Sequence, residues 1–170
     1  MSNVTGTDGQ GFSVVVDSAR QAAERVTPGR QEGSAMAEPL RKIICIEDEP
    51  EIIDLVKLIL GRHSYHVIGA NGGRAGLEII RAEKPDLVLL DLMMPDMDGW
   101  DVYQQMKAEE ETRGIPVIIV TAKAQSIDKV LGLHIAKVDD YIAKPFSPHE
   151  LVESVDRVLA QQREQTHSED

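Results

Sequence analysis

The sequence predicts a doubly wound α/β domain, in which five helices cover a five-stranded parallel sheet. From residue 41 onward, short apolar runs alternate with amphipathic segments, as in a βαβ succession. One of these runs, LVLL at 87–90, contains no polar residue, which is typical of a strand buried on both faces. Parallel strands need crossover connections, and helical crossovers cover both faces of the sheet. In such a domain, ligands bind outside the carboxyl ends of the strands.

The five strands are expected where apolar residues gather in runs of four to six. In chain order they are KIICI (42–46), YHVIGA (65–70), LVLL (87–90), IPVIIV (115–120) and VDDYIA (138–143). The first helix is expected over IIDLVKLIL (52–60), because its apolar residues have helical spacing, Pro50 precedes it and Gly61 ends it. The remaining helices are expected at 74–83, 100–110, about 126–135 and 148 to about 161.

Length and composition indicate one folded domain with flanking segments. The chain has 170 residues, of which 42% are hydrophobic and 28% charged. Residues 1–40 are rich in glycine and small polar residues and are predicted to be a disordered or weakly ordered leader. The domain itself is expected over 41–161, and 162–170 is expected to be a polar acidic tail.

The same data exclude several classes of protein. No apolar run approaches the roughly 20 residues of a membrane-spanning helix, and the N-terminus does not resemble a signal peptide, so the cytoplasm is the expected location. A net charge of -11 argues against direct nucleic-acid binding, which rests on clustered Lys and Arg. Cys45 is the single cysteine, which rules out an internal disulfide and a cysteine cluster for zinc.

Residues suited to a functional site, most of them polar, stand directly after four of the five expected strands. They are Glu47 and Asp48, Asp91, Thr121 and Ala122, and Lys144 and Pro145. Because carboxylates gathered at one edge repel one another, a cluster of Asp48, Asp91 and Glu47 calls for a divalent cation. Oxygen ligands without His or Cys select Mg²⁺ or a similar ion.

These residue types suit phosphoryl transfer. A carboxylate can attack phosphorus and form an acyl phosphate, so Asp91 would be the nucleophile. The Lys144 ammonium and the Thr121 hydroxyl would stabilise the phosphoryl oxygens together with Mg²⁺. The small side chain of Ala122 would leave the entrance open. The simpler alternative is that Asp91 caps the following loop, but its companions at the other strand ends argue against this interpretation.

Other acidic residues are expected to have local roles. Asp96 and Asp98 should shape the loop after the third strand and cap the next helix. Glu49 and Glu51 should favour the N-terminus of the first helix through its dipole. The five histidines are scattered along the chain, which does not suit a metal site or a phosphotransfer histidine.

The stretches CIEDEP, LVLLDLMMPDMDG, VTA and DDYIAKPF, in this order, resemble the receiver domain of bacterial two-component response regulators over residues 41–161. The resemblance implies a flavodoxin-like receiver fold in which Asp91 accepts phosphate from a phosphohistidine on a sensor histidine kinase. It implies Mg²⁺, with Mn²⁺ as the alternative ion, bound by Asp48, Asp91 and the backbone carbonyl of Met93. Glu47 stands where the family often has Asp and would act through a bound water.

The resemblance also implies a switch. Thr121 would be drawn toward the phosphate while Tyr141 turns inward, Lys144 would pair with the phosphate, and the bond from Lys144 to Pro145 would be cis. The chain departs from the family's pattern at two places. Lys137 and Val138 replace the usual Gly-Ala, and Ser154 stands where regulators that dimerise and bind DNA often carry Arg. Both departures put a salt-bridged dimer of that type in doubt.

The expected function is a stand-alone signalling switch that acts on a partner protein, because only about nine residues follow the final helix. Independent turnover of small molecules is not expected. The alternatives are a phosphorelay intermediate that passes phosphate to a histidine phosphotransfer protein, a Mg²⁺-dependent aspartyl-phosphate phosphatase, and a constitutive interaction module. The phosphatase usually has a second Asp two residues after the nucleophile, where this chain has Met93.

Overall fold

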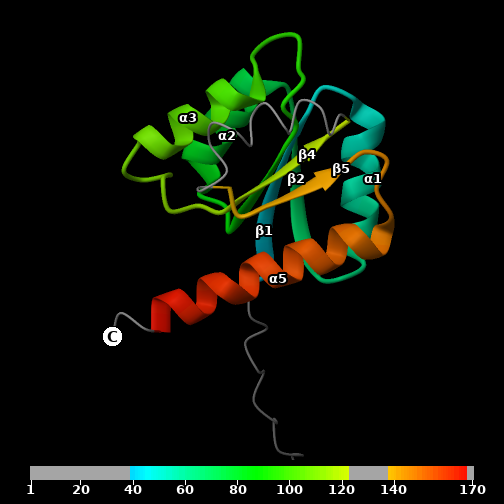
Figure 1. Cartoon of the computed structure of the whole chain (residues 1–170), viewed down its shortest axis with the longest axis vertical. Coiled ribbons are helices and arrows are strands. Elements are labelled where there is room, and N and C mark those ends of the chain that lie inside the picture. The colour runs from blue at the N-terminus through cyan, green and yellow to red at the C-terminus, as the bar shows by residue number, and fades with distance from the viewer. Residues whose placement is uncertain (1–38, 123–137, 168–170) are drawn as a thin grey trace, which may run out of the picture. The chain divides into compact units, whose positions relative to one another are not determined.

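The computed structural model describes residues 39–122 and 138–167, and this part of the chain forms one sheet flanked by helices (Figure 1). The elements in chain order are β1 (Arg41–Glu47), α1 (Pro50–Gly61), β2 (Tyr65–Asn71), α2 (Gly73–Glu83), β3 (Leu87–Leu90), α3 (Gly99–Ala108), β4 (Val117–Thr121), β5 (Asp140–Ala143) and α5 (Pro148–His167). The helix expected at about 126–135 lies outside the described residues, as does the expected leader up to residue 38.

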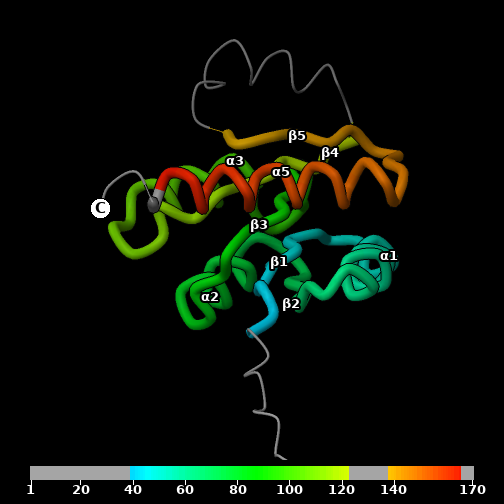
Figure 2. Tube along the Cα trace, turned by 90° about the horizontal axis from the view of Figure 1, so that it is seen from below, coloured from blue at the N-terminus to red at the C-terminus, as the bar shows by residue number. Residues whose placement is uncertain are grey.

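All five strands are parallel, and their order in the sheet is β2-β1-β3-β4-β5 (Figure 2). The chain first winds from β1 outward to β2, then crosses back over β1 to β3 and continues to β5. The winding direction therefore reverses between β1 and β3, which pair directly, with Ile43 opposite Leu87. In a doubly wound sheet the crevice for a ligand opens at this reversal, beyond the carboxyl ends of the two strands. The predicted fold class is confirmed.

Two hydrophobic layers hold the helices against the sheet. Successive side chains of a strand point to opposite faces. Ile43 and Cys45 of β1 accordingly pack with α1 and α5, whereas Ile44 and Ile46 pack with α2 and α3. Figure 1 shows α1 on one side of the sheet and α2 and α3 on the other. Both faces of the central strands are therefore buried, which explains why their sequences are almost continuously apolar.

Several element ends differ from the expected positions. β4 begins at Val117 rather than at residue 115, and β5 begins at Asp140 rather than at 138. α5 continues to His167, beyond its expected end near Gln161, because the residues that follow are helix-compatible and include no Gly or Pro. Much of the segment expected to be a tail is therefore helical. Within the described ranges, no helix combines the length and apolar character needed to span a bilayer.

The loop between β3 and α3 passes close to its own start. The Gly99 N–H donates to the Leu92 carbonyl oxygen at 3.0 Å. A Cβ atom on Gly99 would lie 2.0 Å from the carbonyl oxygen of Asp91. Glycine is therefore required here because the backbone on either side of the loop leaves no space for a side chain. α3 starts at this glycine, and the Asp98 side chain caps it by accepting from the Trp100 N–H at 2.8 Å.

We expect Gly99→Ala to lower the free energy of unfolding by about 1–3 kcal/mol, because the added methyl group must displace the Asp91–Leu92 backbone. Gly114→Ala is the matched control, since a Cβ atom there would meet nothing within 4 Å. Urea denaturation of both variants measures the effect. Equal stabilities of the two variants would show that the loop can move aside at little cost.

Candidate functional site

The carboxyl ends of four strands bring the predicted residues together. The Asp91 N–H donates to the Ile46 carbonyl oxygen at 3.0 Å, which extends the β1–β3 pairing and sets Asp91 beside Glu47. The Lys144 N–H donates to the Thr121 carbonyl oxygen at 2.8 Å, which extends the β4–β5 pairing in the same way. The sheet therefore presents two carboxyl groups, a hydroxyl group and an ammonium group at one edge.

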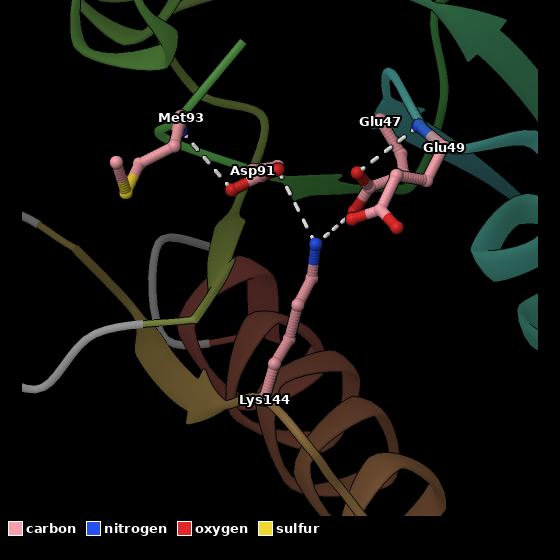
Figure 3. A network of polar contacts seen from close by, with 5 residues as sticks. All are labelled: Glu47, Glu49, Asp91, Met93 and Lys144. Carbon is pink, nitrogen blue, oxygen red and sulfur yellow. Dashed lines mark hydrogen bonds and ion pairs between the residues drawn. The ribbon is translucent and has the colours of Figure 1, made fainter.

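Lys144 bridges two buried carboxylates (Figure 3). Its Nζ lies 2.5 Å from Oε2 of Glu47 and 3.3 Å from Oδ2 of Asp91. Glu47 is 2% exposed and Asp91 4% exposed, so water screens their mutual repulsion poorly. Burial of such charges is tolerated only when they are paired and hydrogen-bonded. The Lys144 ammonium is therefore the group that allows both carboxylates to be buried here.

Each of these carboxylates also accepts a backbone hydrogen bond. The Met93 N–H donates to Oδ1 of Asp91 at 3.1 Å, and the Glu49 N–H donates to Oε1 of Glu47 at 3.3 Å. In both side chains, one oxygen is held by a backbone amide and the other faces Lys144, as Figure 3 shows. This arrangement fixes the orientation of the Asp91 carboxylate and leaves Oδ2 directed at the centre of the site.

The close approach of these charges changes their proton affinities. Burial raises the pKa of Glu47 to about 7; the hydrogen bond from Lys144 opposes this rise, and the nearby charge of Asp91 adds to it. Burial alone would lower the pKa of Lys144, but its hydrogen bond to Glu47 and the charges of both carboxylates hold the pKa above its ordinary value. Lys144 is therefore a permanent cation near neutral pH, whereas Glu47 exchanges its proton in that range.

Thr121 offers an unused hydrogen-bonding group beside this centre. Its side chain is fully buried at the end of β4. Among the described residues, its hydroxyl oxygen is the one buried side-chain oxygen or nitrogen without a hydrogen-bond partner. An unsatisfied buried hydroxyl normally destabilises a protein, and such groups concentrate where a ligand or a second state supplies the partner.

The remaining predicted residues lie around these groups. Ala122 is exposed directly after Thr121, and Tyr141 on β5 is 52% exposed. The peptide bond between Lys144 and Pro145 is cis, as the family resemblance predicted. The roles assigned to Ala122, to the Met93 carbonyl and to the switch pair stay predictions.

The last residue of β1 and the two residues after it have oxygen donors that suit a hard cation. Glu47, Asp48 and Glu49 can each place one carboxylate oxygen within 4.8 Å of the others. This group of three contains oxygen donors and neither His nor Cys, which fits Mg²⁺ or Mn²⁺. Asp48 is half-buried and Glu49 exposed, so the group opens toward solvent. The sequence interpretation had given Glu49 a role only in the dipole of α1, and the structure adds its carboxylate to this group.

Asp96 corrects one expectation. Asp98 caps the next helix, α3, as predicted. The prediction that Asp96 also caps α3 is wrong, because its carboxylate accepts hydrogen bonds from the N–H groups of Gly73 at 3.1 Å and Arg74 at 3.2 Å. Asp96 therefore caps the preceding helix, α2. The sequence signal for this contact was the Gly72-Gly73 pair, which leaves α2 without a capping side chain of its own.

Ser154, a position where the chain departs from the family's pattern, makes a contact within the domain. It is buried, and its hydroxyl donates to the carboxylate of Asp140 on β5. The same carboxylate accepts from Arg157 of α5. Asp140 is thus engaged within its own chain. Of the second departure, Lys137 lies outside the described residues, whereas Val138 is half-buried and packs against the hydrophobic layer under α2 and α3.

The raised pKa of Glu47 predicts a pH-dependent contribution to stability in metal-free protein. The pKa is about 7 in the folded protein against an ordinary value of 4.5, so the folded state binds this proton more tightly than the unfolded chain. The resulting stabilisation is complete below pH 4.5 and is lost as the pH rises through about 7. The quantity to compare is the free energy of unfolding of wild type minus that of Glu47→Gln. We expect this difference to fall as the pH rises from 4.5 to about 7 and to level off above it.

Urea denaturation at a series of pH values, with a chelator present, measures this difference. A difference that is constant between pH 4.5 and 7, or that rises with pH, would contradict the raised pKa of Glu47.

Comparison with known proteins agrees with the geometry of the site. The family model described as "Response regulator receiver domain" matches residues 43–156. The alkaline phosphatase synthesis transcriptional regulatory protein PhoP of Bacillus subtilis is 40% identical over 119 residues. That match includes 70% of this chain and 48% of PhoP, so the chain spans about half the length of this relative.

Solved structures show the same architecture. A CheY-like response regulator receiver domain protein from Methanospirillum hungatei is 32% identical, with a TM-score of 0.67, over 74% of this chain and 98% of the other. The signal receiver domain of a putative Luxo repressor protein from Vibrio parahaemolyticus is 28% identical, with a TM-score of 0.69, over 76% and 98% of the two chains. The family model matches most of the chain, and the expected site residues lie together at the strand ends. The chain therefore belongs to the response regulator receiver domains, the phosphoacceptor signalling modules of two-component systems.

Proposed function

We propose that Asp91 accepts a phosphoryl group from a phosphohistidine of a sensor histidine kinase in a Mg²⁺-dependent reaction. One observation carries this proposal. Asp91 is buried with Oδ1 held by the Met93 N–H, while Oδ2 faces the Lys144 ammonium. A carboxylate held in this way has one oriented nucleophilic oxygen and a cation in place for the incoming charge. Membership of the receiver family supports the same assignment.

In the proposed reaction, Oδ2 of Asp91 attacks phosphorus and the bond from phosphorus to the histidine nitrogen breaks. The electron pair of that bond stays on the imidazole, and the product is an acyl phosphate whose remaining carboxyl oxygen is Oδ1. The Met93 N–H continues to hold Oδ1. Lys144, which already contacts Oδ2, pairs with the phosphoryl oxygens that replace the original negative charge.

Bound Mg²⁺ would neutralise charge on the phosphoryl oxygens as they approach Asp91. The residues proposed to hold it are Asp48, Asp91 and the Met93 backbone carbonyl, with Glu47 acting through a water. A cation would be needed because the phosphoryl group would approach three carboxylates at and after the end of β1, in addition to Asp91 itself. Lys144 supplies one positive charge beside Asp91. The ionised form of Glu47 supports this binding, since a protonated carboxyl is a poor partner for a metal or its water.

The proposed output is a shift between two surfaces of the domain. The unpartnered Thr121 hydroxyl would donate to a phosphoryl oxygen, and the exposed Tyr141 ring would turn inward into the space that Thr121 leaves. The phosphoryl group stabilises one of two conformations, and a partner protein that binds this conformation shifts the population further. The downstream partner is proposed to be a protein, because the net charge of -11 disfavours direct contact with nucleic acid.

The phosphoacceptor assignment is tested by intact-protein mass spectrometry after incubation with acetyl phosphate and Mg²⁺. We expect one phosphoryl adduct on wild type, no adduct when a chelator replaces Mg²⁺, and no adduct on Asp91→Asn. Circular dichroism confirms that the variant is folded. An adduct that persists in Asp91→Asn, or a folded wild type that takes up no phosphate, would count against Asp91 as the acceptor.

Thr121→Val tests the proposed switch. Because the hydroxyl has no partner before phosphorylation, we expect the variant to be as stable as wild type or more stable, by up to about 1–3 kcal/mol. We expect it still to accept phosphate but to lose the change in the environment of Tyr141. Urea denaturation and nuclear magnetic resonance spectra with and without the phosphodonor measure the two effects. A clear loss of stability in the unphosphorylated variant would show that the hydroxyl already has a role there.

A further inference from the structure

Helix α2 is capped by a side chain from a distant loop. The first N–H groups of a helix have no partner within it, and the N-cap residue Gly72 has no side chain to supply one. Asp96 supplies acceptors for the first two N–H groups of α2: Oδ1 accepts from the Gly73 N–H, and Oδ2 accepts from the Arg74 N–H. These backbone donors outweigh partial desolvation and hold the pKa of Asp96 below its ordinary value, so the cap is an ionised carboxylate at neutral pH.

The contact is closely fitted on both sides. Gly72 has φ 108°, and a Cβ atom on it would lie 2.8 Å from Oδ2 of Asp96. A Cβ atom on Gly73 would lie 2.9 Å from Cβ of Met97, the next residue of the loop. Two consecutive glycines therefore let the loop approach the start of α2 at a distance that no other residue would allow.

The same loop holds the phosphoacceptor. It runs from Leu92 to Asp98, and its two ends are held together by the hydrogen bond from the Gly99 N–H to the Leu92 carbonyl oxygen. Between these ends, Met93 holds Oδ1 of Asp91 through its N–H group. Asp96, three residues after Met93, fastens the middle of the loop to α2.

We infer that Asp96 is a positioning residue for the proposed Mg²⁺ site, and that it acts by tying the Leu92–Asp98 loop to helix α2. This inference rests on the proposed function, because the Met93 carbonyl is a proposed ligand of the ion. Asp96 does not touch the ion in this account. Its loss frees the middle of the loop, so the Met93 peptide is no longer held in the orientation that serves both Asp91 and the ion. Residues that orient metal ligands in this indirect way typically affect affinity by 10- to 100-fold.

The test is the dissociation constant for Mg²⁺, measured by isothermal titration calorimetry on the full chain without a phosphodonor. We expect Asp96→Ala to raise this constant about tenfold. Asp98→Ala is the matched control, because it removes an equal charge and a helix cap from the same loop but caps only α3. We expect the dissociation constant of Asp98→Ala for Mg²⁺ to stay within about twofold of wild type. This change is smaller than the roughly tenfold or greater change typical of residues that orient metal ligands.

Two further variants separate the fastening from the charge. Asp96→Asn removes the charge but keeps one of the two oxygen acceptors, so its dissociation constant should lie between those of wild type and Asp96→Ala. Gly72→Ala displaces Asp96 from the α2 side and should weaken Mg²⁺ binding as Asp96→Ala does. Gly61→Ala is its control, since a Cβ atom there would meet nothing within 4 Å. Hydrogen exchange at the Gly73 and Arg74 amides, without any metal, should quicken in both Asp96→Ala and Gly72→Ala.

The outcomes are distinct. If wild type binds Mg²⁺ and folded Asp96→Ala binds it with the same dissociation constant, the inference is overturned and the proposed function is unaffected. If Asp98→Ala weakens Mg²⁺ binding as much as Asp96→Ala does, the inference is also overturned, because the effect would come from charge or general stability. The same holds if Asp96→Asn and Asp96→Ala weaken Mg²⁺ binding equally, because the lost charge would then explain the effect. A folded wild type that binds no Mg²⁺ overturns the proposed metal site and this inference with it.

Discussion

The ion pairs of Lys144 with Glu47 and Asp91 are the interaction on which the site depends. Two carboxylates with almost no solvent exposure would each be expensive to ionise, and they would repel each other. The ammonium between them offsets part of this repulsion, although burial still raises the pKa of Glu47 to about 7. Lys144 is already placed where a phosphoryl group on Asp91 would carry its charge. The same contact stabilises the buried carboxylates in this structure and, in the proposed reaction, would meet the charge of the incoming phosphoryl group.

That interaction requires the whole sheet. Lys144 and Glu47 are 97 positions apart in the chain, and they meet because β5 and β1 end at the same edge. The reversal of winding between β1 and β3 makes Glu47 and Asp91 neighbours, and the two apolar layers fix the strands in register. A shift of one residue in a strand would move each of its side chains to the opposite face. The precision of the site is thus a consequence of core packing.

Several features of the site are locally unfavourable and are tolerated because the surrounding structure compensates for them. Thr121 keeps a buried hydroxyl without a partner among the described residues, Glu47 has a raised pKa, and the loop after β3 passes its own start at Gly99 with no space for a side chain. Functional sites commonly combine such features, because groups satisfied in the resting protein cannot respond to a new charge. For the two buried carboxylates, backbone amides compensate in part by holding one oxygen of each.

The sequence by itself determined the α/β class, the order of the strands along the chain and the site residues at their ends. These follow from periodic apolar patterns and from the rule that parallel strands end at one edge, both of which depend on interactions within a few residues or on general topology. Only the tertiary structure decided that Lys144 bonds Glu47 directly, that Glu49 joins the acidic group and that Asp96 caps α2 rather than α3. A capping carboxylate is recognisable in a sequence, but its partner is set by which helix N-terminus lies nearest in space, and here that helix begins 23 residues earlier in the chain.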